Sequence, residues 1–165
     1  MKNFLFLAAF VMTMAVTQSL NAQTSNKNKL ITGDIAVNAG TVNKTLFERL
    51  GGTGGITAIV DDVIEAHMNN PAISARFLPL KAQPEKLAII RQHTIDFFSA
   101  GSGGSTIYAG RNMPTTHKGM NINPTEYMHV VDDILKVLDK HNADDETKKD
   151  VLAILWSLKD MIISK

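Results

Sequence analysis

The stretch GGSTIYAGRNMPTTH, from Gly103 to His117, decides how the rest of the chain is interpreted. Two glycines end an apolar helical pattern, and residues of low helix propensity follow until one histidine begins a new segment. The chain has no cysteine. An imidazole presented between two apolar helices is a candidate ligand for a metal ion or a haem iron. Taken alone, the same histidine would be interpreted first as a surface residue of a loop.

Apolar residues recur at helical spacing over most of the remaining chain. Such patterns cover residues 46–50, 56–68, 87–98, 127–138 and 151–163, with residues 72–80 as a short link. Pro84 and Pro124 suit the first turn of a helix, and Asp144 suits the position before one. Because no segment has the alternating pattern of a strand, we expect an all-α domain.

The first 22 residues have the layout of a secretory signal peptide. Lys2 supplies a positive charge, and residues 4–16 form an apolar run interrupted only by Thr13. This run is shorter than the roughly 20 residues of a membrane span. We expect cleavage after Ala22 and export to the periplasm or the outside of the cell, with no stable membrane span afterwards. The alternative is an uncleaved N-terminal anchor.

Composition divides the rest of the chain into a linker and one domain. Residues 23–44 are rich in Asn, Thr, Ser and Gly, which suits a flexible linker, and residues 45–165 are enough for one compact domain. The chain has 17 basic and 16 acidic residues, and Lys2 is the only charged residue of the first 22. The mature chain is therefore neutral, which argues against a nucleic-acid-binding protein.

An ordered set of motifs resembles group 1 truncated haemoglobins over residues 45–163. The set comprises LFERLGG at Leu46–Gly52, Phe77 after Arg76, Phe97-Phe98, Gly103-Gly104, Tyr108-x-Gly110, Met113 and His117. The resemblance implies a two-over-two helical sandwich, shortened from the globin fold, with haem between the two helix pairs. It also implies that His117 is the proximal ligand of the iron. The haem should be of the b type, because the chain contains no Cys-x-x-Cys-His motif for covalent attachment.

The resemblance further implies which residues line the haem pocket. They are Phe77, Ile90, His93, Thr94, Phe97, Phe98, Tyr108, Met113, His117 and Val130. His93 lies three residues after Ile90 and four before Phe97, so it flanks the apolar face of its helix. It is either an internal sixth ligand of the iron or a residue at the pocket rim. The metal ligands are therefore His117 and, in the first case, His93.

The other histidines and the distal side need separate interpretations. His67 lies on the inward side of its helix and suits a partly buried packing role, whereas His129 and His141 suit solvated positions. Family members often carry a tyrosine where this chain has Ile64, and a glutamine where it has Thr94. Loss of a hydrogen-bond partner for bound dioxygen removes on the order of 1 to 3 kcal/mol of binding free energy, which argues against very tight oxygen storage.

These residues leave three classes of function. The first is a haem protein that reversibly binds oxygen, nitric oxide or carbon monoxide. The second is an enzyme on the same scaffold: a nitric-oxide dioxygenase, a peroxidase-like protein or an electron-transfer protein, with an unidentified reductase as partner. The third is a haem-free helical binding module, which the motif around His117 disfavours.

Overall fold

The computed structural model describes residues 44–165. The predictions of a signal peptide at residues 1–22 and of a linker up to residue 43 lie outside the described residues. Within residues 44–165 no helix is long and apolar enough to cross a membrane.

The described part of the chain is helical throughout, as predicted. Its elements are α1 (Leu46–Arg49), α2 (Gly52–Asn69), α3 (Ser74–Phe77), the 3₁₀ helix η1 (Leu78–Ala82), α4 (Pro84–Gly101), α5 (Met113–His117), α6 (Pro124–Lys140) and α7 (Asp145–Ile162). The only extended pairing among these residues is an isolated parallel bridge between Ile122 and Ile163. The all-α fold class is therefore confirmed.

Local sequence explains where the long helices begin. Pro84 and Pro124 occupy the first turns of α4 and α6, where a missing N–H costs no hydrogen bond. Asn123 and Glu126 form a capping box at the start of α6. The Asp144 side chain accepts a hydrogen bond from the Thr147 N–H at 2.7 Å, which caps α7.

Two local predictions were wrong. The segment predicted as a short link is largely helical, because it contains α3 and η1. A turn sets its start: the Asn70 side-chain oxygen accepts a hydrogen bond from the Ala72 N–H, and the Asn70 carbonyl accepts one from Ser74. His117 ends the short helix α5 and does not begin a segment, because Asn112 caps this helix five residues earlier through the Thr115 N–H.

Gly104 allows the chain to leave α4 close to its own helix and to α1. A Cβ atom at this position would lie 2.8 Å from both the Phe47 ring and the Ser99 carbonyl oxygen. Only glycine avoids these two contacts without a shift of the backbone. The second glycine of the motif is therefore a packing requirement, and it starts the loop that carries Tyr108.

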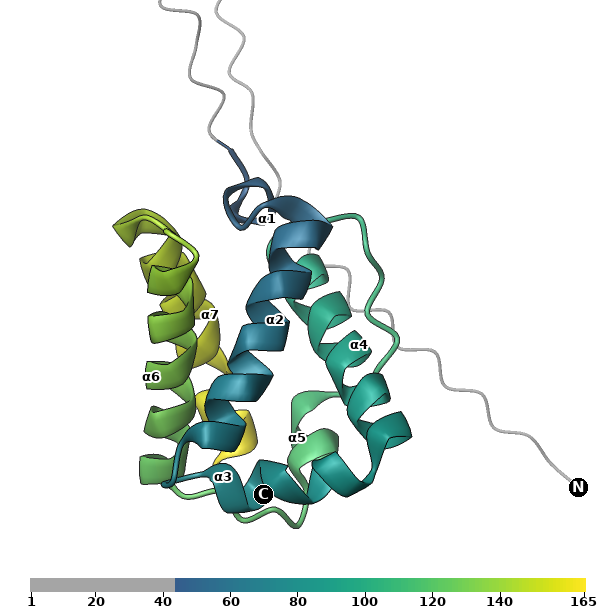
Figure 1. Cartoon of the computed structure of the whole chain (residues 1–165). Coiled ribbons are helices and arrows are strands. Elements are labelled where there is room, and N and C mark those ends of the chain that lie inside the picture. The colour runs from purple at the N-terminus through teal and green to yellow at the C-terminus, as the bar shows by residue number, and fades with distance from the viewer. Residues whose placement is uncertain (1–43) are drawn as a thin grey trace, which may run out of the picture. The chain divides into compact units, whose positions relative to one another are not determined.

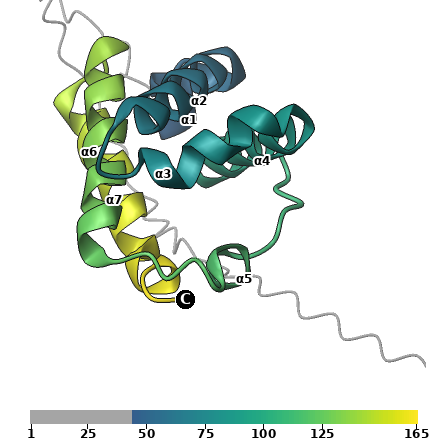
Figure 2. The ribbon, with the colours of Figure 1, turned by 60° about the horizontal axis from the view of Figure 1, so that its bottom comes forward.

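The helices form two packed pairs. Helix α2 packs against α4, α6 packs against α7, and the pairs meet where α2 contacts α6. Figures 1 and 2 show this arrangement, with α5 set apart from α4 and connected to it by the intervening loop. Helix α5 packs against α7, and η1 packs against α4. The expected two-over-two sandwich is confirmed.

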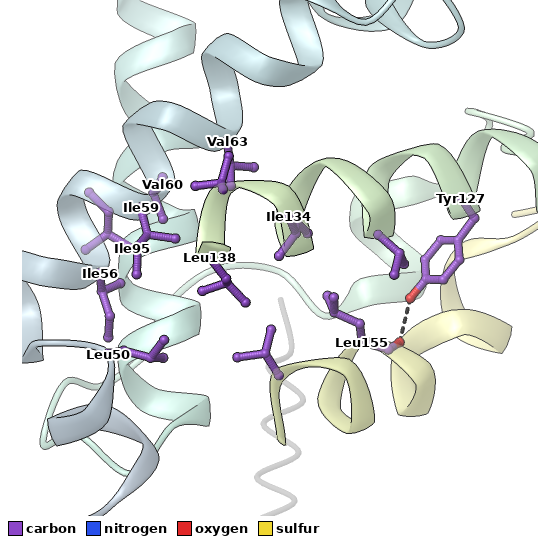
Figure 3. Packing of buried hydrophobic residues seen from close by; sticks show 13 residues of the cluster. Leu50, Ile56, Ile59, Val60, Val63, Ile95, Tyr127, Ile134, Leu138 and Leu155 are labelled. Carbon is purple, nitrogen blue, oxygen red and sulfur yellow. Dashed lines mark hydrogen bonds between the residues drawn. The ribbon is translucent and has the colours of Figure 1, made fainter. Parts of the chain in front are cut away.

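The core fills the junction of α2, α4, α6 and α7 (Figure 3). It consists of Leu50, Ile56, Ile59, Val60, Val63, Ile95, Tyr127, Val131, Ile134, Val137, Leu138, Val151 and Leu155. The Tyr127 hydroxyl donates a hydrogen bond to the Leu155 carbonyl oxygen at 2.5 Å, which ties α6 to α7 within this core. Helix α4 buries only Ile95 and Ser99 completely, and its Ile89 and Ile90 side chains are exposed.

Candidate functional site

The imidazole of His117 is held by its own helix. Its Nδ1 lies 2.8 Å from the Met113 carbonyl oxygen, one turn earlier in α5. A carbonyl can only accept a hydrogen bond, so Nδ1 carries the proton and Nε2 keeps its lone pair. Within the described residues Nε2 has no hydrogen-bond partner. This tautomer and this fixed ring are what an iron-ligating histidine requires.

The elements around α5 leave apolar side chains uncovered. None of α3, η1 or α5 buries a residue completely. On η1 and α4, Leu78, Ile89 and Ile90 are 43%, 58% and 37% exposed. Exposed aliphatic side chains on adjacent elements are characteristic of a surface that another apolar group covers. A porphyrin is such a group, so the apolar residues fit haem as well as the imidazole does.

The donor set also fits haem. Among residues 44–165, no three side chains of His, Asp or Glu converge to hold a bare metal ion. Haem brings four nitrogen ligands of its own and needs only one imidazole from the protein. His117 would hold the group, and Met113 would orient His117.

His93 is exposed and lies beside the loop that links α4 to α5. Its ring meets Tyr108 edge to face, with centroids 6.1 Å apart, and Phe97 meets the same tyrosine at 5.3 Å. The Tyr108 hydroxyl donates to the Arg111 carbonyl oxygen at 2.8 Å, and its ring covers Gly110. Three predicted site residues therefore form one aromatic cluster, in which His93 points to Tyr108.

The remaining predicted residues are less closely grouped. The Thr94 hydroxyl donates to the Ile90 carbonyl oxygen at 2.8 Å, so its proton is already used within α4. Phe98 and Val130 are partly buried and pack against the core, and Phe98 also meets Phe97 edge to face. Met113 is half-buried on α5.

Phe77 lies against a polar group that the sequence did not predict. Its ring centroid is 4.8 Å from that of His67, whose Nδ1 lies 3.0 Å from the Asp133 carboxylate. Asn70 also donates to Asp133. The inward position expected for His67 is confirmed, because its side chain is buried, but the sequence did not predict its partner Asp133. A signal existed, because Asp133 lies three residues after Val130 and four before Val137, on the inward face of α6.

An ion pair anchors α3. Arg76 donates two hydrogen bonds of 2.9 Å to the Glu126 carboxylate at the start of α6. The backbone N–H of Asn123 and the Arg76 guanidinium hold the pKa of Glu126 below its usual range. This pair fixes the residue next to Phe77, so α3 is attached to the helix that carries Asp133.

His141 does not have the solvated position that we expected. It follows α6 directly, and its Nε2 lies 2.7 Å from the Asp62 carboxylate on α2. Lys140 binds the same carboxylate at 2.9 Å. The hydrogen bond from Lys140, and to a smaller extent the one from His141, lowers the pKa of Asp62. The prediction failed because the C-terminal end of α6 contacts α2, and helix periodicity alone does not indicate such a contact.

Residues 45–164 match the family model "Bacterial-like globin". The chain is 27% identical over 114 residues to a group 1 truncated haemoglobin of Synechocystis sp., covering 67% of this chain and 88% of that protein.

Solved structures share the fold. Truncated haemoglobin from Tetrahymena pyriformis in its Fe(III) form is similar with a TM-score of 0.67 and 20% identity, over 74% of this chain and all of that one. The 2/2 haemoglobin of Synechococcus sp., described with covalently attached haem, gives a TM-score of 0.62 and 19% identity, over 70% and 94% of the two chains. The chain belongs to the bacterial-like globin family, and this family indicates haem iron as its cofactor.

Proposed function

We propose that this protein binds one b-type haem through Nε2 of His117 and reversibly holds a diatomic gas on the opposite side of the iron. The observation that carries the proposal is the 2.8 Å hydrogen bond from His117 Nδ1 to the Met113 carbonyl oxygen. It fixes the tautomer that leaves Nε2 available. When bound, haem supplies the iron at which the gas is taken up and released.

The distal residues favour release over tight retention. Ile64 and Ile90 offer no hydrogen-bond donor, and the Thr94 hydroxyl is committed to the Ile90 carbonyl oxygen. A dioxygen ligand, which carries partial negative charge, therefore lacks a strong protein partner. The missing interaction is worth on the order of 1 to 3 kcal/mol, so retention should be roughly tenfold weaker or more. Oxygen is the gas we propose, as a readily exchanged ligand.

His93 is the proposed internal sixth ligand. In the described arrangement its ring lies against Tyr108, so His93 would have to leave this contact to bind the iron. An incoming gas then competes with His93, and its apparent affinity falls by the fraction of molecules that are open.

Absorption spectroscopy of the haem-reconstituted full chain tests the proximal assignment. Wild type should give a Soret band and retain haem through gel filtration, and the haem should extract into acidic organic solvent because it is not covalently attached. His117→Ala should retain no stable haem. The matched control is His129→Ala, a half-buried histidine on α6 without a hydrogen-bond partner in the described residues. Normal haem retention by His117→Ala would refute the assignment.

A further inference from the structure

The pair formed by His67 of α2 and Asp133 of α6 is buried in the seam between the two helix pairs. Both side chains are 7% exposed, and His67 Nδ1 lies 3.0 Å from Asp133 Oδ2. The Asn70 amide donates to both carboxylate oxygens at 3.0 and 2.9 Å. Its own carbonyl oxygen accepts from the Ala72 N–H at 3.1 Å. The histidine is thus connected through a carboxylate and an amide to the turn that precedes α3.

The chemistry of the pair fixes the orientation of the imidazole. Burial lowers the pKa of His67, and Asp133 opposes the shift without reversing it. His67 is therefore neutral near pH 7, with its proton on Nδ1 facing Asp133. A buried carboxylate needs such donors, because an unpaired charge in the core is strongly unfavourable. The ring of His67 has little freedom to turn while this hydrogen bond persists.

The oriented ring lies directly against Phe77. The ring centroids are 4.8 Å apart and the planes are inclined by 35°. The preceding residue, Arg76, is tied to Glu126 of α6 by two hydrogen bonds. Helix α3 buries no residue completely. The contact with His67 and this backbone anchor therefore both hold the Phe77 ring in place.

We propose that His67 and Asp133 form a positioning pair that fixes the ring of Phe77 against the face of the haem. The inference rests on the proposed haem site, in which Phe77 lines the pocket. An apolar core filling would support the ring sterically but would not set its angle. The hydrogen bond from His67 to Asp133 sets this angle, because it fixes the orientation of the imidazole against which the Phe77 ring packs.

The test combines NMR of the Phe77 ring with the rate of haem loss to excess apomyoglobin, both measured on the full chain. The Phe77 signals are assigned by comparison with Phe77→Leu. Asp133→Leu removes the acceptor, so we expect shifted and broadened Phe77 signals and haem loss roughly tenfold faster, the effect of one lost hydrogen bond. Asp133→Asn keeps one acceptor for Nδ1 but turns an amide N–H toward the Asn70 amide, so both readouts should change less than in Asp133→Leu.

Two further variants separate positioning from core stability. The double variant His67→Phe with Asp133→Leu keeps an aromatic ring and an apolar core without a buried charge, so it should fold even if Asp133→Leu does not. It should still shift the Phe77 signals and accelerate haem loss. Asp62→Leu removes the matched carboxylate of the pair with His141, which is remote from Phe77, and should leave the Phe77 signals unchanged.

Wild-type ring shifts and haem loss in the double variant would overturn the proposal, since the pair would then only fill the core. The Phe77 signals are also recorded before haem is added. If wild type binds no haem, the proposed function fails, while the signals of the haem-free chain still show whether the pair orients Phe77. Unchanged haem-free signals in Asp133→Leu would overturn the positioning role by itself.

Discussion

His93 and Tyr108 meet edge to face across the junction of α4 and the loop that follows it, with ring centroids 6.1 Å apart. Such a contact contributes on the order of 1 kcal/mol. The tyrosine is fixed in turn by the hydrogen bond from its hydroxyl to the Arg111 carbonyl oxygen. If His93 binds the iron as we propose, Tyr108 would compete with the haem iron for the His93 imidazole, and the balance between the two positions would set how open the distal site is.

The first prediction concerns this balance. Without external gas, a sizeable fraction of the haem iron should be six-coordinate and low-spin through His93. His93→Ala should convert the absorption spectrum to high-spin and speed carbon monoxide binding. Tyr108→Leu should act in the opposite direction, because it removes the competing contact. A wild-type spectrum that is already fully high-spin would make His93 a residue of the pocket rim.

The second prediction is a pH dependence of stability that arises from His67. Burial lowers the pKa of this imidazole below its ordinary value of 6.5. The unfolded chain therefore takes up a proton first as the pH falls below 6.5, and the free energy of unfolding decreases until the folded pKa is passed. The free energy of unfolding should fall more steeply with decreasing pH in wild type than in the double variant His67→Phe with Asp133→Leu. Urea unfolding of both proteins between pH 7 and 5 measures it, and equal slopes would contradict it.

The third prediction concerns the hydrogen bond between α6 and α7. Tyr127→Phe removes the donor to the Leu155 carbonyl oxygen and should lower the free energy of unfolding by about 1 kcal/mol. Burial also raises the pKa of Tyr127 above its ordinary value of 10.0. Wild type should therefore lose stability as the pH rises above 10, where the unfolded tyrosine ionises first. Tyr127→Phe should lack this loss, which denaturant titration at alkaline pH will show.

The fourth prediction uses two adjacent glycines at the start of α2. A Cβ atom at Gly55 would lie 2.0 Å from the Leu50 carbonyl oxygen, whereas one at Gly54 would meet nothing within 4 Å. Gly55→Ala should destabilise the protein by about 1 to 3 kcal/mol through overpacking. Gly54→Ala should be neutral or stabilising by up to about 1 kcal/mol, because alanine favours the helix. Thermal unfolding of the two variants compares them directly, and similar melting temperatures would refute the difference.

The fifth prediction is export, which we propose from the sequence of residues 1–22 alone. Mature protein from the native host should begin at or near Gln23. N-terminal sequencing or intact-mass measurement checks this, and intact Met1 on protein recovered from the cytoplasm would count against cleavage.

Local sequence pattern is enough to predict the long helices of this protein. Periodic apolar residues, first-turn prolines and the caps at Asn123 and Asp144 act within a few residues of chain, so their effects can be read from local pattern. The spacing of the motif that ends at His117 is likewise a property of the sequence alone.

Which polar groups meet depends on how the helices pack. His67 and Asp133 are 66 residues apart, and their contact depends on how α2 packs across α6. The pairing of His141 with Asp62 arises at the other end of the same seam, 79 residues apart. Helix periodicity tells which side of a helix faces inward, but it does not tell which residue of another helix it faces. The orientation of His93 toward Tyr108 was decided in the same way, by the path of the loop between α4 and α5.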